Sequence, residues 1–206
     1  MVDFWANEAA GILKFETYAD LVENLYQRAL VESISHIKSV PDINTLIETA
    51  IRNHLAYDLE NNNTQLRPYL EYKTLKLTKE NTLLLSPTQS KRTDIEFFIS
   101  GFGDFVVECK NLKSADQRYI EEGINRFIQG FYSSRDSEAG MIGFIVGGKI
   151  TTIIPKMISK INAEPSSVDD IDEQGICSDY NSSFHSNHHR ANNTQIYIHH
   201  LFVDLQ

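Results

Sequence analysis

The stretch KRTDIEFFISGFGDFVVECKNLK, residues Lys91–Lys113, decides the fold of this chain. Two runs within it, Arg92–Ser100 and Phe105–Lys110, are rich in the aromatic and β-branched residues that strands favour. The turn sequence SGFGD lies between them, and its glycines, Gly101 and Gly103, can adopt the positive φ angles of a tight turn. The stretch therefore predicts a β-hairpin whose strands carry charged side chains.

The register of this hairpin brings three charged residues together. If the turn centres near Gly101, residue i pairs with residue 202 − i, so Asp94 lies opposite Glu108. Opposed residues share a face with Cβ atoms about 5 Å apart, and Lys110 shares that face because side chains alternate along a strand. Facing carboxylates repel one another, and a hard divalent cation such as Mg²⁺ or Mn²⁺ would relieve the repulsion. A lysine beside such a cation suits attack of water on a phosphodiester.

An ordinary explanation also fits these residues. A glutamate and a lysine on a half-exposed hairpin commonly form a surface ion pair that contributes little to stability. The flanking runs IEFFI and FVV favour a strand that is buried on at least one face, so we prefer the site. Cys109 points to the opposite face and is expected to be a small core residue. Glu96 shares the face of Asp94, and we expect it to face solvent.

Patterns outside the hairpin predict an α/β (α+β) domain with a central mixed sheet. Apolar residues at helical spacing indicate helices over 3–38, 43–59 and 120–131, and a further helix over 151–162. Strands are predicted over 69–78, 82–86, 140–148 and 196–205. We divide the single domain 1–206 into four parts: an N-terminal helical extension, 1–40, a core, 41–150, a long irregular loop, 163–194, and a closing strand, 195–206. The extension either caps the sheet or forms a dimer surface.

Composition narrows the setting. The chain has 206 residues, 41% of them hydrophobic, and contains no apolar run of the roughly 18 residues that a spanning helix needs. Its start is acidic, unlike a secretory signal, and its two cysteines make no disulfide framework. We therefore expect a cytoplasmic protein without membrane contact. The net charge of −9 argues against a protein that coats nucleic acid by charge alone.

The segments TDIEFF and FVVECKNL resemble the PD-(D/E)XK nuclease superfamily, which has the restriction-endonuclease-like fold. In that superfamily an aspartate on one strand precedes a Glu-x-Lys on the next. Here Asp94 matches the aspartate and Glu108–Lys110 matches the Glu-x-Lys. The literal Pro-Asp of the family is absent, because Thr93 precedes Asp94. The family core, α-β-β-β-α-β, follows the order of the elements predicted between residues 42 and 147.

The resemblance implies a set of metal ligands. Asp94, Glu108 and the backbone carbonyl of Cys109 would hold Mg²⁺ or Mn²⁺. The first core helix of the family often adds a glutamate, for which Glu48 is the candidate and Asp42 a weaker one. Glu48 also has an ordinary alternative, because an arginine four residues later, in ETAIR, could pair with it on the helix surface.

The resemblance continues after the hairpin. YIEEGINRFIQGFY followed by GMIGFIVGG is similar to a helix and strand of nucleases from bacterial defence loci. Arg126 and Gln129 on this helix are candidates to contact a substrate phosphate.

The histidine-rich segment HSNHHR, residues 185–190, offers a possible metal site. Cys177 with the histidines of this segment matches no tight structural zinc spacing, so we expect a solvated loop. Arg190 is a further candidate for contact with a phosphate backbone. His199 and His200 point to opposite faces of the last strand, and we expect one of them to be buried and hydrogen-bonded.

These observations predict a metal-dependent nuclease that acts on DNA, with RNA left open as substrate. A homodimer or a partner protein of a defence system is also expected from the resemblance. The alternative is a catalytically silent subunit with the same fold that binds a protein partner. The acidic surface predicted for the N-terminal helices favours that alternative, since it suits a basic partner.

Overall fold

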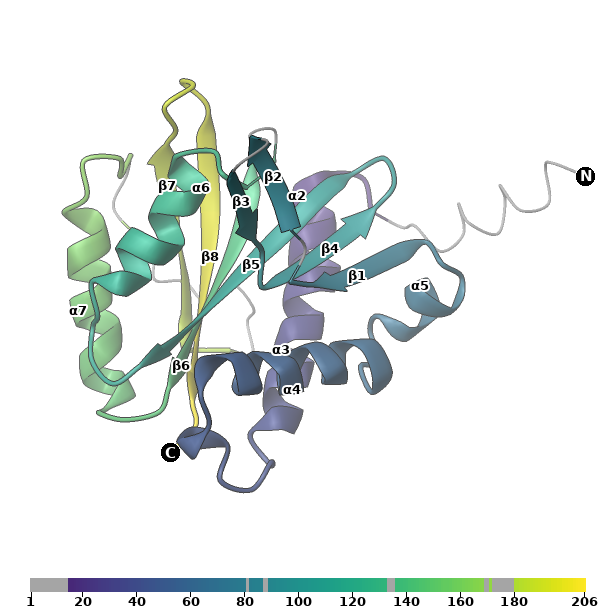
Figure 1. Cartoon of the computed structure of the whole chain (residues 1–206), viewed down its shortest axis with the longest axis horizontal. Coiled ribbons are helices and arrows are strands. Elements are labelled where there is room, and N and C mark those ends of the chain that lie inside the picture. Colours follow the sequence, from purple (N-terminus) through teal and green to yellow (C-terminus); the bar gives the residue numbers. More distant parts are fainter. Residues whose placement is uncertain (1–14, 81, 87–88, 133–135, 169–170, 172–179) are drawn as a thin grey trace, which may run out of the picture.

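Six strands form one mixed sheet in the computed structural model, which describes residues 15–80, 82–86, 89–132, 136–168, 171 and 180–206 (Figure 1). The strand order is β1-β4-β5-β6-β8-β7. β5 and β8 pair with β6 in parallel, and the other neighbours are antiparallel. The bounds are β1 Leu75–Lys79, β4 Ile95–Ile99, β5 Gly103–Leu112, β6 Glu138–Ile145, β7 Ser183–His189 and β8 Gln195–Asp204. A separate hairpin pairs β2, Thr82–Ser86, with β3, Gln89–Arg92.

Helices precede the sheet and connect its strands. The described helical elements are α2 Tyr18–Leu21, the π-helical turns η1 Val22–Gln27 and η3 Ile120–Ile124, α3 Arg28–Ile37, the 3₁₀ turn η2 Ile43–Thr45, α4 Glu48–Asn61, α5 Arg67–Glu71, α6 Asn125–Ile128 and α7 Ile150–Asn162. The chain is thus a mixed α/β protein, as the sequence predicts. None of the helices described has the length and apolar character needed to span a bilayer.

Helices cover both faces of the sheet, and successive side chains of β5 pack alternately against the helices of one face and of the other. Phe105, Val107 and Cys109 pack in one core with side chains of α2, α3 and α4. Val106 and Leu112 pack in a second core with η3, α6 and α7. The N-terminal helices therefore cap the sheet, which was one of the two roles expected for them. The predicted helical residues before Phe15 lie outside the described part.

The hairpin has the predicted register. Ile95 pairs with Val107 and Ile99 with Gly103, so each pair obeys the relation of residue i with 202 − i. Gly101 and Gly103 have φ angles of 95° and 109°, the left-handed backbone that the turn requires. The predicted strand Arg92–Ser100 is broken, however, because β3 ends at Arg92 and β4 begins at Ile95.

Two other predictions are wrong in part. The segment 69–78 is a strand only from Leu75, because Pro68 starts the short helix α5 where its missing N–H costs nothing. The loop predicted over 163–194 contains β7, which pairs with β8 along the sheet edge. The polar sequence of β7 did not indicate a strand, because several of its buried side chains are polar and hydrogen-bonded rather than apolar. For example, the Ser186 hydroxyl contacts both His188 Nε2 and His200 Nε2 at 2.8 Å.

Candidate active site

The C-terminal half of β5 has one open edge, because its neighbour β4 does not extend alongside it. β4 begins at Ile95, and β5 continues beyond this point without β4 beside it. Two carboxylates occupy the edge instead: Asp94 Oδ2 accepts from the Cys109 N–H at 2.8 Å, and Glu48 Oε2 accepts from the Asn111 N–H at 2.9 Å. The site is therefore fixed by backbone hydrogen bonds of β5 as well as by its side chains.

Lys110 lies between two of the predicted carboxylates. Its Nζ is 3.7 Å from Glu48 Oε1 and 3.8 Å from Glu108 Oε2, and its side chain is only 11% exposed. The prediction that Lys110 and Glu108 share a face is thus confirmed. Glu48 turns toward the sheet and pairs with Lys110, whereas Arg52 bonds to Asp94, so the alternative pairing of Glu48 with Arg52 is wrong.

Glu108 is the most deeply buried charged group of the site, with 1% exposure. Its Oε2 accepts from Arg126 Nη1 at 3.0 Å, and the same nitrogen donates to the Tyr132 hydroxyl at 3.0 Å. Within the described residues Glu108 Oε1 has no hydrogen-bond partner. Burial, and then the charge of Asp94, raise the pKa of Glu108 to about 7, although Tyr132, Lys110 and Arg126 oppose the shift.

This raised pKa gives a pH prediction. Because the folded pKa of Glu108, about 7, exceeds its ordinary value of 4.5, the folded chain binds more protons than the unfolded chain between these pH values. The free energy of unfolding contributed by Glu108 is full below pH 4.5 and falls as the pH rises to 7. Between pH 4.5 and 7, the free energy of unfolding of wild type should fall by up to about 3 kcal/mol relative to that of Glu108→Gln, as measured by urea unfolding. Stability curves that stay parallel would contradict the assignment.

Arg52 was not predicted as part of the site. Its Nη1 donates to Asp94 Oδ1 and its Nη2 to Glu80 Oε1, both at 2.5 Å. The Glu80 N–H also donates to the Asp94 carbonyl at 3.2 Å, so Arg52 holds together the two ends of the segment that carries β2 and β3. The spacing of Arg52 from Glu48 on α4 could have indicated a shared helix face, but its partners come from distant parts of the chain. No sequence signal indicated Tyr132.

Among the residues described, this edge offers a hard divalent cation one buried oxygen rather than a complete set of ligands. The buried, unpartnered Oε1 of Glu108 is an oxygen that such an ion would satisfy. An N–H and C=O of one residue lie on the same edge of a strand, so the Cys109 carbonyl faces the side on which Asp94 accepts. As the side chains lie, no three His, Cys, Asp or Glu residues in the described part of the chain are grouped to hold a metal ion, and Asp94 and Glu108 are paired with Arg52 and Arg126 instead.

Other predicted residues lie elsewhere. Gln129 is exposed at the C-terminal end of α6, and Asp42 is exposed with a φ of 54°, so the structure brings neither into the cluster. Glu96 is 9% exposed and accepts from the Thr93 hydroxyl at 3.5 Å, so the prediction that it faces solvent is wrong. Cys109 is a buried core residue as predicted, and burial raises the pKa of its thiol.

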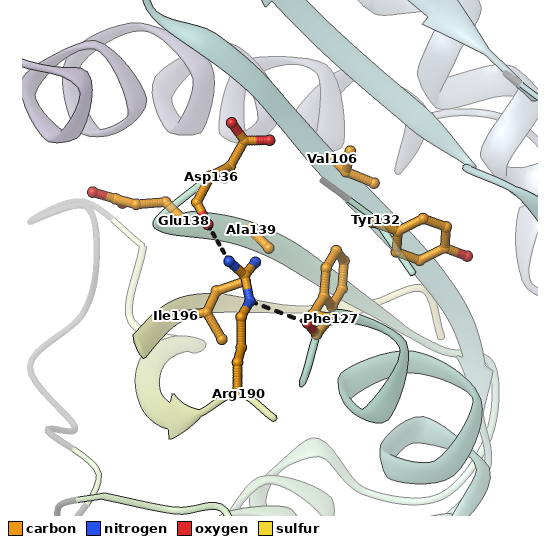
Figure 2. A pocket seen from close by; sticks show the side chains of 8 residues that line it. All are labelled: Val106, Phe127, Tyr132, Asp136, Glu138, Ala139, Arg190 and Ile196. Carbon is orange, nitrogen blue, oxygen red and sulfur yellow. Dashed lines mark hydrogen bonds between the residues drawn. The ribbon is translucent and has the colours of Figure 1, made fainter. Parts of the chain in front are cut away.

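Arg190 is buried and hydrogen-bonded to backbone carbonyls, whereas the sequence predicted a solvated loop. Figure 2 shows its guanidinium inside a pocket of the sheet, where Nε donates to the Phe127 carbonyl and Nη1 to the Asp136 carbonyl, at 3.2 and 2.7 Å. Arg190 is only 5% exposed. It joins the end of α6 to the start of β6 from β7, and this position does not suit contact with a phosphate backbone.

One histidine of β7, His188, and one of β8, His200, are buried in the core. His200 is fully buried, with Nδ1 3.0 Å from the Tyr119 hydroxyl, which confirms that one histidine of the last strand is buried and hydrogen-bonded. His188 is also buried, and burial lowers its pKa to about 4. His199 Nε2 lies 2.5 Å from Glu138 Oε2. Cys177 lies outside the described residues.

A comparison of the chain with protein families, curated proteins and solved structures finds no match. The fold and the site define only a class: a mixed α/β protein with one buried carboxylate, Glu108, beside a lysine at an open strand edge.

Proposed function

We propose that this chain is a metal-dependent phosphodiester hydrolase, a nuclease with DNA as its expected substrate. One observation carries the proposal: the Lys110 ammonium is held 3.7 Å from Glu48 and 3.8 Å from Glu108 at a strand edge that Asp94 caps. With α5 and the separate β2–β3 hairpin set aside as insertions, the order α4, β1, β4, β5, η3 with α6, and β6 supports a restriction-endonuclease-like core, α-β-β-β-α-β.

Each residue has a defined role in this proposal. To hold Mg²⁺ or Mn²⁺, Asp94, Glu108 and Glu48 would turn from their present partners and join the Cys109 carbonyl as ligands. The ion would supply Lewis acidity and lower the pKa of a water bound to it. Lys110 orients the attacking water and stabilises the negative charge that develops on the phosphate. The strands and the hydrogen bonds to β5 keep these groups in a fixed geometry, as a hydrolytic site requires.

A catalytically silent subunit is the second candidate function. The observation that favours it is the internal neutralisation of both carboxylates, of Asp94 by Arg52 and of Glu108 by Arg126. Such pairing would let the fold persist without a cation and leave the acidic surface for a protein partner.

Metal binding separates the two candidates. In isothermal titration calorimetry, we expect Mn²⁺ and Mg²⁺ to bind wild type with dissociation constants of roughly micromolar to millimolar size, as oxygen-ligand sites do. Glu108→Gln should weaken this binding at least about 10-fold, because it removes a charged ligand. The control Glu122→Gln, an exposed carboxylate on η3, should bind like wild type. No heat of binding with either metal would favour the silent subunit.

A further inference from the structure

An open pocket of about 450 Å³ lies beside the candidate active site, at the carboxyl ends of the parallel strands β5 and β6. Asn44, Thr45 and Ile47 line it from the segment before α4, and Lys113, Ser114 and Arg118 line it from the segment after β5. Open α/β sheets commonly bind ligands at this end of their strands.

The pocket and the active site share a wall. Asn111 lines the pocket, its N–H donates to Glu48 Oε2 at 2.9 Å, and its Nδ2 donates to the Leu46 carbonyl at 3.3 Å. Glu48 Oε1 in turn lies 3.7 Å from Lys110 Nζ. A strand of nucleic acid with one phosphate at Lys110 would therefore continue directly into the pocket.

The lining carries groups that recognise phosphodiester oxygens. Lys113 is an exposed ammonium, and Arg118 has a side chain that is 66% exposed. Asp116 also lines the pocket and pairs with Arg118 at 3.0 Å, so these two charges offset each other and Lys113 leaves one net positive charge. The hydroxyls of Thr45 and Ser114 supply donors of the kind that contact phosphate and sugar. The lining is thus weakly positive, whereas the whole chain has a net charge of −9.

The size of the pocket favours a single strand. A volume of 450 Å³ is that of a pocket for one small ligand, which suits a nucleotide unit of one strand better than the wide surface of a duplex. The exposed apolar side chain of Ile47 lies among the polar groups of the lining, where a sugar or base can cover it.

We propose that this pocket binds the phosphodiester backbone of a single nucleic-acid strand next to the scissile bond, through Lys113 and Arg118. The inference rests on the proposed nuclease function and adds the form of its substrate. DNA and RNA share the backbone chemistry involved, so the experiment compares them.

The test is fluorescence anisotropy in EDTA, where cutting cannot occur, with labelled single-stranded DNA, single-stranded RNA and duplex DNA. Lys113→Ala/Arg118→Ala should bind single strands at least about 10-fold more weakly than wild type and lower the slope of log affinity against log salt by about 1.4, for two phosphate contacts. Lys38→Ala/Lys156→Ala, which removes two exposed cations elsewhere, is the matched control and should keep the larger part of wild-type affinity and slope.

Three outcomes would overturn the inference: no binding of any strand, equal affinity and slope for the double variant and the control, or tighter binding of duplex than of single strands. The proposed function is judged separately, by metal-dependent cutting and by Lys110→Ala. Binding that depends on Lys113 and Arg118 without any cutting would keep the pocket and reject the nuclease.

Discussion

Lys110→Ala is expected to reduce the rate of phosphodiester cleavage by at least about 100-fold, the usual loss when one preorganised charge-stabilising group is removed. The ammonium lies within 4 Å of two carboxylates, and its side chain is 11% exposed, so bulk water replaces it poorly. Cleavage should be measured at saturating Mg²⁺ so that weaker metal binding does not account for the loss.

Two controls make the result specific. Lys76→Ala removes an exposed lysine from β1 and should leave the rate unchanged. Lys110→Met keeps the apolar stem of the side chain, so its thermal midpoint should stay closer to wild type while its rate falls as in Lys110→Ala. If Lys110→Ala cut at the wild-type rate, Lys110 would have no catalytic role.

Arg52→Leu is expected to lower the free energy of unfolding by about 3 kcal/mol or more, as breaking a buried ion pair does. The side chain of Arg52 is 9% exposed, and that of its partner Asp94 is 13% exposed. The variant leaves the Asp94 carboxylate in a weakly solvated position without its guanidinium partner, although the Cys109 N–H still donates to it. Urea unfolding gives the change as a shift of midpoint at constant slope.

The exposed pair of Arg67 and Glu71 supplies the control. Its side chains are 73% and 65% exposed, so Arg67→Leu should cost no more than about 0.5 kcal/mol. Adding Asp94→Asn to Arg52→Leu should recover part of the stability, because the uncompensated charge is gone. Equal costs for Arg52→Leu and Arg67→Leu would show that Arg52 does not hold the site together.

Local chemistry made the hairpin predictable. Gly101 and Gly103 fix the turn, the turn fixes the register, and the register places Lys110 and Glu108 on one face. The burial of Cys109 follows from the same alternation. These features depend on residues that lie close together in the sequence.

Features that depend on distant residues were not predicted. The pairing of Arg52 with Asp94 joins residues 42 positions apart. Arg126 was expected to contact a substrate phosphate, but its guanidinium donates to the Glu108 carboxylate instead. Arg190 was expected in a solvated loop, but it directly follows β7, which pairs with β8 in the sheet, and it is buried. Composition describes how polar a segment is, whereas burial of its polar groups depends on partners that the rest of the fold provides.

Cleavage by the wild-type protein is the most direct test of the account. Supercoiled plasmid, linear duplex, single-stranded DNA and RNA should each be incubated with Mg²⁺, Mn²⁺ or EDTA, beside Glu108→Gln. We predict cutting of at least one substrate that requires metal and is lost in the variant. A folded wild-type protein that cuts none of these substrates with either metal would contradict the assignment of Asp94, Glu108 and Lys110 as a hydrolytic site.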